Sequence, residues 1–148
     1  MLIKINFAVI KETLRLYPPA PLILRKVEKD LVLPNGKTLV AGTGALVNIW
    51  ATHRNTEYWG LDAEDFRPER FLAPLPHPAA FLAFSFGVRN CIGYQYAIMS
   101  LKTSMTSLLR QFRVTSANKQ TNSQEPLRVQ FDIMMRDVND FKIQLKTR

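Results

Sequence analysis

Prolines place the strongest limit on how this chain can fold. The segment from 58 to 85 has no helical or strand periodicity and contains Pro68, Pro74, Pro76 and Pro78. Because proline lacks a backbone N–H and fixes φ, this segment cannot form a long helix or a central strand. We therefore expect a long loop, and such loops in compact chains are usually either functional or partly disordered.

Two helices are predicted on either side of that loop. The first runs from Ile5 to about Tyr17 on a 3.6-residue apolar spacing, and Pro18 stops it. The second follows Gly93 and has a core-facing stripe at steps of three and four, formed by Ile98, Leu101, Met105, Leu108 and Phe112. Its cationic residues lie off that stripe.

Short strands account for much of the rest. The ranges with the apolar content of short strands are 21–27, 31–33, 38–40, 45–50, 128–136 and 141–146. The second and third flank an Asn-Gly turn, which is typical of a β-hairpin. The expected fold class is therefore mainly α with small β-sheets, an α+β protein.

Composition sets the broad class. With 148 residues, 47% of them hydrophobic, the chain can form about one domain with a core. No apolar run has the length of a membrane span, and the start lacks the features of a signal peptide. The net charge of +8 suggests an acidic partner. One cysteine excludes an internal disulfide, and two histidines argue against a multi-ligand zinc site.

Cys91 stands directly before the second predicted helix, where the helix dipole favours a thiolate and free amides can orient it. Gly87 and Gly93 bracket it, permitting positive φ and a close approach by a planar ligand. Arg89 could pair with a carboxylate on that ligand, and Phe84 could cover the sulfur. A lone buried cysteine is usually inert, so the combination of these residues carries the argument.

The combined pattern Phe-x-x-Gly-x-Arg-x-Cys-x-Gly, with Ala97 four residues beyond the last glycine, resembles the cysteine loop of the haem-thiolate monooxygenases, the cytochrome P-450 family. Residues 12–15 are similar to the Glu-x-x-Arg of the family's K helix, and residues 68–71 to the Pro-x-Arg-Phe of its meander loop. Three motifs in one order make chance a poor explanation. The residues around the three motifs resemble those of animal microsomal cytochromes P-450 of the fourth family and their insect relatives.

Glu12 and Arg15 stand at i and i+3 on one helix face and can pair there. Arg70 would complete a carboxylate held between two guanidinium forks. An isolated Glu-x-x-Arg is more often a solvated surface pair, worth under about 1 kcal/mol. Because the loop that leads to Cys91 needs an anchor, we expect a buried structural triad that pins it to the first helix.

The resemblance implies that Cys91 is the catalytic site residue and the axial ligand of a haem iron. Around the haem it implies Arg89, Arg25, Phe84, Gly87 and Gly93. Arg25 occupies the place from which the family's first strand sends an arginine to a haem propionate, although an exposed strand arginine fits the sequence equally well. His53 lies in a polar segment and matches no ligand position of the family, so we assign it no catalytic role.

The resemblance also implies an activity and a location. A flavoprotein NADPH reductase, in some cases with cytochrome b5, supplies electrons, and one atom of O₂ enters a lipophilic substrate such as a fatty acid, hormone or xenobiotic. The intact protein is expected in the endoplasmic reticulum membrane, held by an N-terminal anchor outside this chain. Residues 1–148 are expected to form a single incomplete domain, the C-terminal part of the fold, with K helix, hairpin region, meander, cysteine loop and L helix.

Two other readings compete with this one. On the first interpretation the chain alone is expected not to be catalytically competent, because the distal helix and most substrate-recognition segments lie outside it. The alternative is a truncated, catalytically inactive remnant that keeps these motifs without the activity. A nucleic-acid-binding module is disfavoured, since Lys and Arg are not interleaved with exposed aromatic residues and the sequence shows no recognition helix. The positive charge instead suggests docking to an acidic flavin domain, with Lys102, Arg110 and Arg113 as candidate docking charges.

Overall fold

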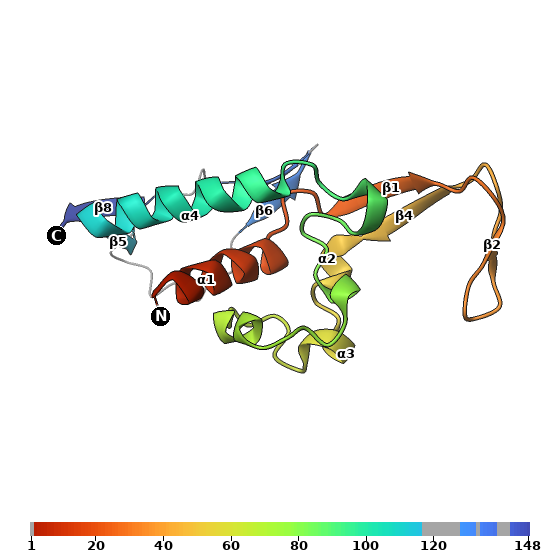
Figure 1. Ribbon diagram of the computed structural model, residues 1–148, viewed down its shortest axis with the longest axis horizontal. Coiled ribbons are helices and arrows are strands. Elements are labelled where there is room, and N and C mark those ends of the chain that lie inside the picture. Colours follow the sequence, from red (N-terminus) through yellow and green to blue (C-terminus); the bar gives the residue numbers. More distant parts are fainter. Residues whose placement is uncertain (1, 117–127, 133, 139–142) are drawn as a thin grey trace.

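The computed structural model describes residues 2–116, 128–132, 134–138 and 143–148. Two long helices dominate this part of the chain, α1 (Leu2–Leu16) and α4 (Tyr94–Gln111), and α4 lies over α1 in Figure 1. The first helix ends one residue before its predicted limit, because Pro18 and Pro19 follow. The α+β class predicted from the sequence is confirmed by this mixture of helices and small sheets.

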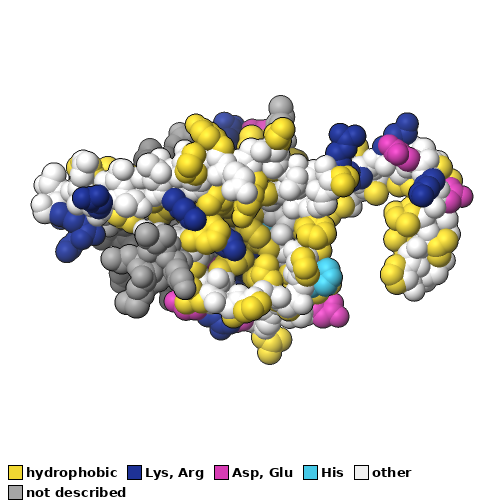
Figure 2. Space-filling view, viewed as in Figure 1, with side chains coloured by type: hydrophobic (Ala, Val, Ile, Leu, Met, Phe, Trp, Pro, Cys, Tyr) yellow, Lys and Arg dark blue, Asp and Glu magenta, His cyan; other side chains and the backbone are white. Residues whose placement is uncertain are grey.

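The strands of the described residues form four two-stranded antiparallel sheets. β1 (Leu22–Lys26) pairs with β4 (Gly44–Asn48), and between them β2 (Leu31–Val32) and β3 (Thr38–Leu39) form the predicted hairpin. The turn of that hairpin places Gly36 at φ +79°, a backbone conformation that residues with a Cβ rarely adopt. The hairpin projects from the body of the molecule (Figure 1), and Figure 2 shows hydrophobic side chains along it.

The predicted strand at 45–50 ends early, at Asn48. The Asn48 side chain accepts a 3.0 Å hydrogen bond from the Ala51 amide and so begins a short helix, α2 (Ile49–Thr52). Asn55 caps the next short helix, α3 (Thr56–Trp59), in the same way. These two caps turn the chain away from the sheet and into the proline-containing loop.

The proline loop is ordered by single turns and an aromatic core. The turns η1 (Pro68–Leu72), η2 (Pro78–Ala80) and η3 (Gly87–Arg89) are 3₁₀ helices, and a proline opens each of the first two. A hydrophobic cluster holds the loop together, formed by Trp59, Ala63 and Ala80 with Phe71, Leu75 and Phe81 against them. The prediction that this segment forms neither a long helix nor a central strand is therefore confirmed, and the loop is ordered.

The C-terminal part corrects two predictions. Phe112 does not continue the second helix but begins β5 (Phe112–Ser116), which pairs with β8 (Ile143–Thr147). The range 128–136 is not one strand, since β6 (Val129–Phe131) turns back onto β7 (Met135–Asp137). Residue 133 of that range and residues 141–142 of the last predicted strand lie outside the described residues.

The stripe predicted to face the core on α4 is only partly buried. Ile98 is buried, whereas Leu101 is 39% exposed, because α1 covers only part of the length of α4. Within the described ranges no helix has both the length and the apolar character to cross a bilayer.

Candidate functional site

The cysteine loop, defined here as residues 84–93, presents Cys91 at the surface. The Cys91 thiol is free and exposed. Its backbone is fixed on both sides, since the Cys91 amide donates to the Phe84 carbonyl (2.8 Å) and the Cys91 carbonyl accepts from the Tyr94 amide (3.3 Å). Gly93 is the N-cap of α4, so the sulfur stands two residues before the positive end of that helix. The thiol is thus oriented by the backbone and open to an external ligand.

Two positions in the cysteine loop have positive φ, Ser85 (63°) and Gly87 (79°). Gly93, which was expected to share this property, has φ −85°. A Cβ there would lie 3.8 Å from the Cys91 sulfur, which is an ordinary contact, so the described residues show no steric need for glycine at this position. The left-handed Ser85 was not anticipated, since serine carries no sequence signal for positive φ.

The side chains beside the thiol are apolar and open to solvent. Val88 and Ile92 are fully exposed, and Phe86 is 62% exposed. Phe84, which was expected to cover the sulfur, packs edge-on against Tyr94 with ring centroids 4.7 Å apart. Exposed apolar side chains gathered in one loop are typical of a surface that binds an apolar ligand or partner.

Two arginines lie close to this apolar surface. Arg25, on β1, donates to the Ser85 hydroxyl (3.0 Å) and weakly to the Arg89 carbonyl (3.4 Å). The Arg89 side chain belongs to an exposed residue of the cysteine loop. A thiol, apolar side chains and two guanidinium groups in one place suit a flat apolar macrocycle that carries a thiophilic metal and carboxylates. These residues therefore fit a haem.

Behind the cysteine loop, Glu12 and Arg15 form a fully buried ion pair at 0% exposure each. The pairing is bidentate, with Arg15 Nε donating to Glu12 Oε2 and Arg15 Nη2 to Oε1, both at 2.7 Å. Arg15 Nη1 also donates to the carbonyls of His53 (2.8 Å) and Ala63 (2.6 Å), and Nη2 to that of Asp65 (3.0 Å). One guanidinium thus joins α1 to the end of α2 and to the proline loop.

Arg70 lies at the same carboxylate but does not form the second fork that the sequence suggested. Its Nε is 3.5 Å from Glu12 Oε1 and finds no hydrogen-bond acceptor among the described residues. Glu12 Oε1 already accepts from Arg15 and from the Arg67 amide (2.8 Å), which occupies its favourable directions. Glu12, Arg15 and Arg70 are called the buried ion cluster below.

The fork of Arg70 is directed to the loop backbone. Its Nη1 donates to the Trp59 carbonyl (2.6 Å), and its Nη2 donates to the Asp62 carbonyl and pairs with the Asp62 carboxylate (2.9 Å). Desolvation opposes ionisation of Asp62, but the hydrogen bond and charge of Arg70, with the charge of Arg67, hold its pKa below the usual value. Arg70 therefore anchors the segment 59–62 beside the cluster.

His53 is a structural residue whose role the sequence did not reveal. It is fully buried, and its two ring nitrogens lie 2.9 Å from the Arg15 carbonyl and 2.7 Å from the Leu82 amide nitrogen. Its surroundings in the sequence are polar, which gave no sign of burial. The capping asparagines at 48 and 55 are the available signal, since they predict two short helices with His53 between them.

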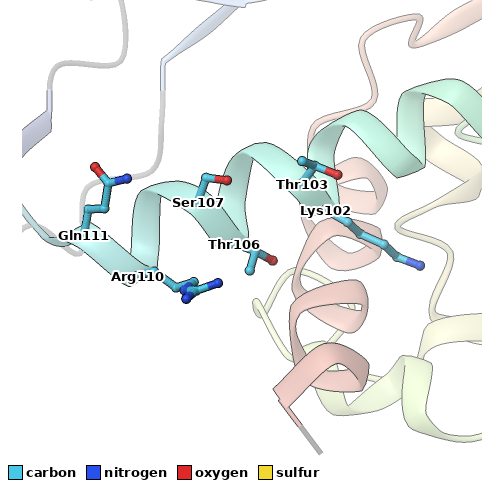
Figure 3. A pocket seen from close by; sticks show the side chains of 6 residues that line it. All are labelled: Lys102, Thr103, Thr106, Ser107, Arg110 and Gln111. Atoms are coloured by element: carbon cyan, nitrogen blue, oxygen red, sulfur yellow. The ribbon is translucent and has the colours of Figure 1, made fainter.

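The cationic residues predicted for docking fall into two places. Lys102 and Arg110 line one open cavity of about 620 Å³ along α4, and Figure 3 shows both with Thr106 on the side toward α1. Arg113 lies beyond the helix on β5. The Lys102 ammonium sits 3.9 Å from the Phe7 ring centroid, a ring that Lys11 also approaches at 4.5 Å. Burial, and then the charge of Lys102, lower the pKa of Lys11.

A second cavity, of about 270 Å³, lies between the start of β1 and the β6–β7 hairpin. Its lining is largely apolar: Pro21, Leu22, Trp50, Val129, Phe131 and Met135, with the amides Asn48 and Gln130. A cavity with this lining suits an apolar chain or ring better than a charged molecule.

Comparisons with known proteins show which family the chain resembles. The profile of the family described as Cytochrome P450 matches residues 3–140. The chain is 42% identical over 112 residues to "Probable cytochrome P450 313a1" of Drosophila melanogaster, covering 74% of this chain and 23% of the relative. It is 46% identical over 110 residues to "Cytochrome P450 4X1" of Rattus norvegicus, covering 72% and 22%. For "Cytochrome P450 4V2" of Mus musculus the values are 41% over 143 residues, 95% and 26%. The chain spans about a quarter of the length of these relatives.

Proposed function

The chain belongs to the cytochrome P450 family, and on that premise we propose that it is the part of a haem-thiolate monooxygenase that binds the haem iron, through Cys91. In the intact enzyme this part serves the insertion of one atom of O₂ into a lipophilic substrate, such as a fatty acid, a hormone or a xenobiotic. Because the chain spans about a quarter of its relatives, activity, substrate and partners are inferences from the family.

One observation carries the proposal: a free, exposed thiol at the start of a long helix, surrounded by exposed apolar side chains. The Phe84 carbonyl and the Tyr94 amide hold the Cys91 backbone, so the Cα–Cβ bond of Cys91 has a fixed direction. Val88 and Ile92 would bury their side chains against an apolar ring, which removes them from water. An inert structural cysteine would instead be packed inside the protein.

Arg25 and Arg89 supply the charge that carboxylate groups at the rim of the ring require. Arg25 is already held at the cysteine loop through Ser85, so little ordering is needed for it to bind a carboxylate. Phe84 stays against Tyr94 and keeps the first turn of α4 beside the thiol. Gly87, with positive φ and open space beside its Cα, lets the ring plane approach the backbone, and Gly93 adds no side chain on that side.

When bound, haem supplies the O₂ chemistry, and a cysteine ligand increases the electron density at the iron. The chain's own part is to hold the thiolate, to exclude water with apolar side chains, and to orient the carboxylates with arginines. The buried ion cluster holds the proline loop, and with it the cysteine loop, against α1.

Partners and location follow from the same premise. Electrons would come from an acidic flavoprotein NADPH reductase, with cytochrome b5 as a second donor, docking on Lys102, Arg110 and Arg113. The largely apolar 270 Å³ cavity fits a lipophilic substrate. The intact protein would lie at the endoplasmic reticulum membrane, as microsomal relatives do. No role in nucleic-acid binding is proposed.

The test is the carbon monoxide difference spectrum of the purified chain after addition of haem and reduction. The wild-type chain should give the Soret band of a thiolate-ligated ferrous haem, and Cys91→Ser should lose that band. Ser104→Ala, on the exposed side of α4, is the matched control and should keep it. No haem uptake by the wild-type chain would contradict the proposal and favour a catalytically inactive remnant.

A second comparison tests the carboxylate contact. Arg25→Gln should weaken haem retention by about tenfold, the factor expected for the loss of one charge-assisted hydrogen bond. The control is Lys26→Gln, which removes the same charge from the next residue of β1. Equal retention by the two variants would argue against a role for Arg25 at a carboxylate.

A further inference from the structure

The imidazole of His53 connects two segments that are far apart in the sequence. His53 ends α2, where its own amide donates to the Ile49 carbonyl (2.9 Å). Its Nδ1 is 2.9 Å from the carbonyl of Arg15, on α1, and its Nε2 is 2.7 Å from the amide nitrogen of Leu82. A fully buried ring thus bridges the helix of the buried ion cluster and the segment that enters the cysteine loop.

The two contacts fix which nitrogen carries the proton. The Leu82 amide can only donate, so Nε2 must be the acceptor and must be unprotonated. The Arg15 carbonyl can only accept, so Nδ1 must carry the hydrogen. Burial lowers the pKa of His53 to about 4, and the charges of Arg15 and Arg54 act in the same direction against the hydrogen bond to Arg15. The neutral form therefore prevails at physiological pH.

From Leu82 the restraint continues to the cysteine. The Leu82 carbonyl accepts from the Ser85 amide at 2.8 Å, and the Phe84 carbonyl accepts from the Cys91 amide at 2.8 Å. The ring of Phe81 stacks on the imidazole, with centroids 5.3 Å apart and planes 12° apart. The Phe84 carbonyl orients the Cys91 backbone. Its position depends on the turn 82–85, and His53 holds the first residue of that turn, Leu82.

The other ties to this segment are weaker. Arg25 reaches Ser85 in a half-buried contact and the Arg89 carbonyl in an exposed one. Residues 81–91 are all described, and among their hydrogen bonds that involve a side chain, the one from the Leu82 amide to His53 is the fully buried one, whereas those of Arg25 are partly buried or exposed. Buried hydrogen bonds are the ones whose loss leaves an unsatisfied donor away from water.

We propose that His53 is a positioning residue for Cys91, whose imidazole accepts the Leu82 amide and so fixes the turn that holds the Cys91 backbone in its ligating orientation. This inference rests on the proposed function for the identity of the ligand, haem. It assigns His53 no contact with that ligand.

Two variants of His53 separate its two hydrogen bonds. In His53→Gln the side-chain oxygen reaches the place of Nε2 and can still accept from Leu82, while the contact with Arg15 is lost. In His53→Asn the side-chain amide stands at the place of Nδ1 and can still donate to Arg15, while the contact with Leu82 is lost. Both variants lose the stacking on Phe81, so the pair is matched in that respect.

The first readout is the thiolate-ligated share of bound haem in the reduced carbon monoxide complex. It should fall roughly tenfold in His53→Asn, the effect of one buried unsatisfied amide, and stay close to wild type in His53→Gln. Equal shares in the two variants would overturn the proposal. A wild-type chain without the thiolate band would overturn the proposed function instead.

The second readout needs no haem. Amide hydrogen exchange at Cys91 should be about tenfold faster in His53→Asn than in His53→Gln, while exchange at Ile98 within α4 stays the same. If the haem experiment fails but this difference is found, the positioning role stands and the ligand assignment does not. Equal exchange at Cys91 in the two variants would contradict the positioning role.

A third readout uses the wild-type chain alone and so does not depend on whether either variant folds. The sequence holds two histidines, His53 and His77, which makes the imidazole nitrogen spectrum simple to assign. At neutral pH, His53 should have a protonated Nδ1 and an unprotonated Nε2. A protonated Nε2 would exclude the bond from Leu82 and overturn the proposal.

Discussion

The buried ion cluster and the cysteine loop reverse the usual distribution of side chains between the inside and the outside of a protein. Glu12 and Arg15 are fully buried, whereas Val88 and Ile92 are fully exposed. Charged side chains are seldom buried unless paired, and apolar ones seldom gather at the surface unless something covers them. The buried charges find their partners within this chain, whereas the exposed apolar side chains would be covered by the haem proposed above.

The two regions also differ in how they are held. Arg15 donates to the carbonyls of His53, at the end of α2, and of Ala63 and Asp65 in the proline loop, as well as to Glu12. Several segments therefore meet at one side chain. The Cys91 backbone is held mainly by backbone hydrogen bonds to Phe84 and Tyr94. The difference predicts that substitutions in the cluster change the stability of the fold, while substitutions at the thiol change ligand binding.

The largest effect is expected from Glu12→Gln. The variant leaves the Arg15 guanidinium buried without a counter-charge, which costs about 3–5 kcal/mol of unfolding free energy. Urea unfolding of the chain measures this cost. The matched control is Glu28→Gln at an exposed position, expected to stay within about 0.5 kcal/mol. A cost below about 1 kcal/mol for Glu12→Gln would mean that the cluster does not hold the fold.

The next effect is a pH dependence that comes from His53. Burial lowers its pKa in the folded chain to about 4 from a usual value of 6.5, so the unfolded chain binds a proton over that interval and the folded chain does not. Stability is fully present above pH 6.5 and is lost as the pH falls toward 4. The loss should reach about 3 kcal/mol relative to the non-titrating His53→Gln. Parallel pH profiles for the two chains would contradict the burial of a neutral His53.

Arg70→Lys should have an intermediate effect. An ammonium cannot reach the Trp59 carbonyl and both Asp62 oxygens at once, and the unmet carbonyls cost about 2 kcal/mol. We also expect this variant to fail in haem incorporation, because the proline loop loses its anchor. Arg67→Lys is the control, since Arg67 pairs with the same carboxylate but is 55% exposed, and it should cost under about 1 kcal/mol. Normal haem incorporation by Arg70→Lys would refute the anchoring role.

The smallest effect on stability is expected from Cys91→Ser. The thiol is exposed and its backbone contacts do not depend on the side chain, so the unfolding free energy should change by less than about 0.5 kcal/mol. The same variant should abolish the thiolate spectrum. A large loss of stability would show that Cys91 is part of the folded frame and would remove the contrast between the two regions.

Local features of the fold could be predicted from the sequence. Pro18 fixed the end of α1 within one residue, and the Asn-Gly turn located the β2–β3 hairpin. The pairing of β5 with β8 could not be predicted in this way. Phe112 continues the helical period of α4, and its partner across the sheet is Thr147, far along the chain. Long-range strand pairing leaves no mark in a local apolar period.

The site shows the same division. The motif residues Glu12, Arg15 and Arg70 lie together as their pattern indicated, because side-chain chemistry is visible in a sequence. The main acceptors of Arg15 and Arg70 are backbone carbonyls, which every residue has and no motif marks. The tie from His53 to Leu82 is of the same kind, since one partner is an amide. The backbone partners of the motif side chains are therefore the part of the site that could not be predicted from the sequence.

The central claim is that Cys91 is an exposed thiol that binds the iron of an apolar ring. The most direct test is the rate at which the Cys91 thiol is alkylated with and without haem. Cys91 is the single cysteine of the chain, so the reagent reports on this site alone. Without haem the thiol should react readily, and haem at about ten times its dissociation constant should slow the reaction about tenfold. An unchanged rate at saturating haem would contradict the account.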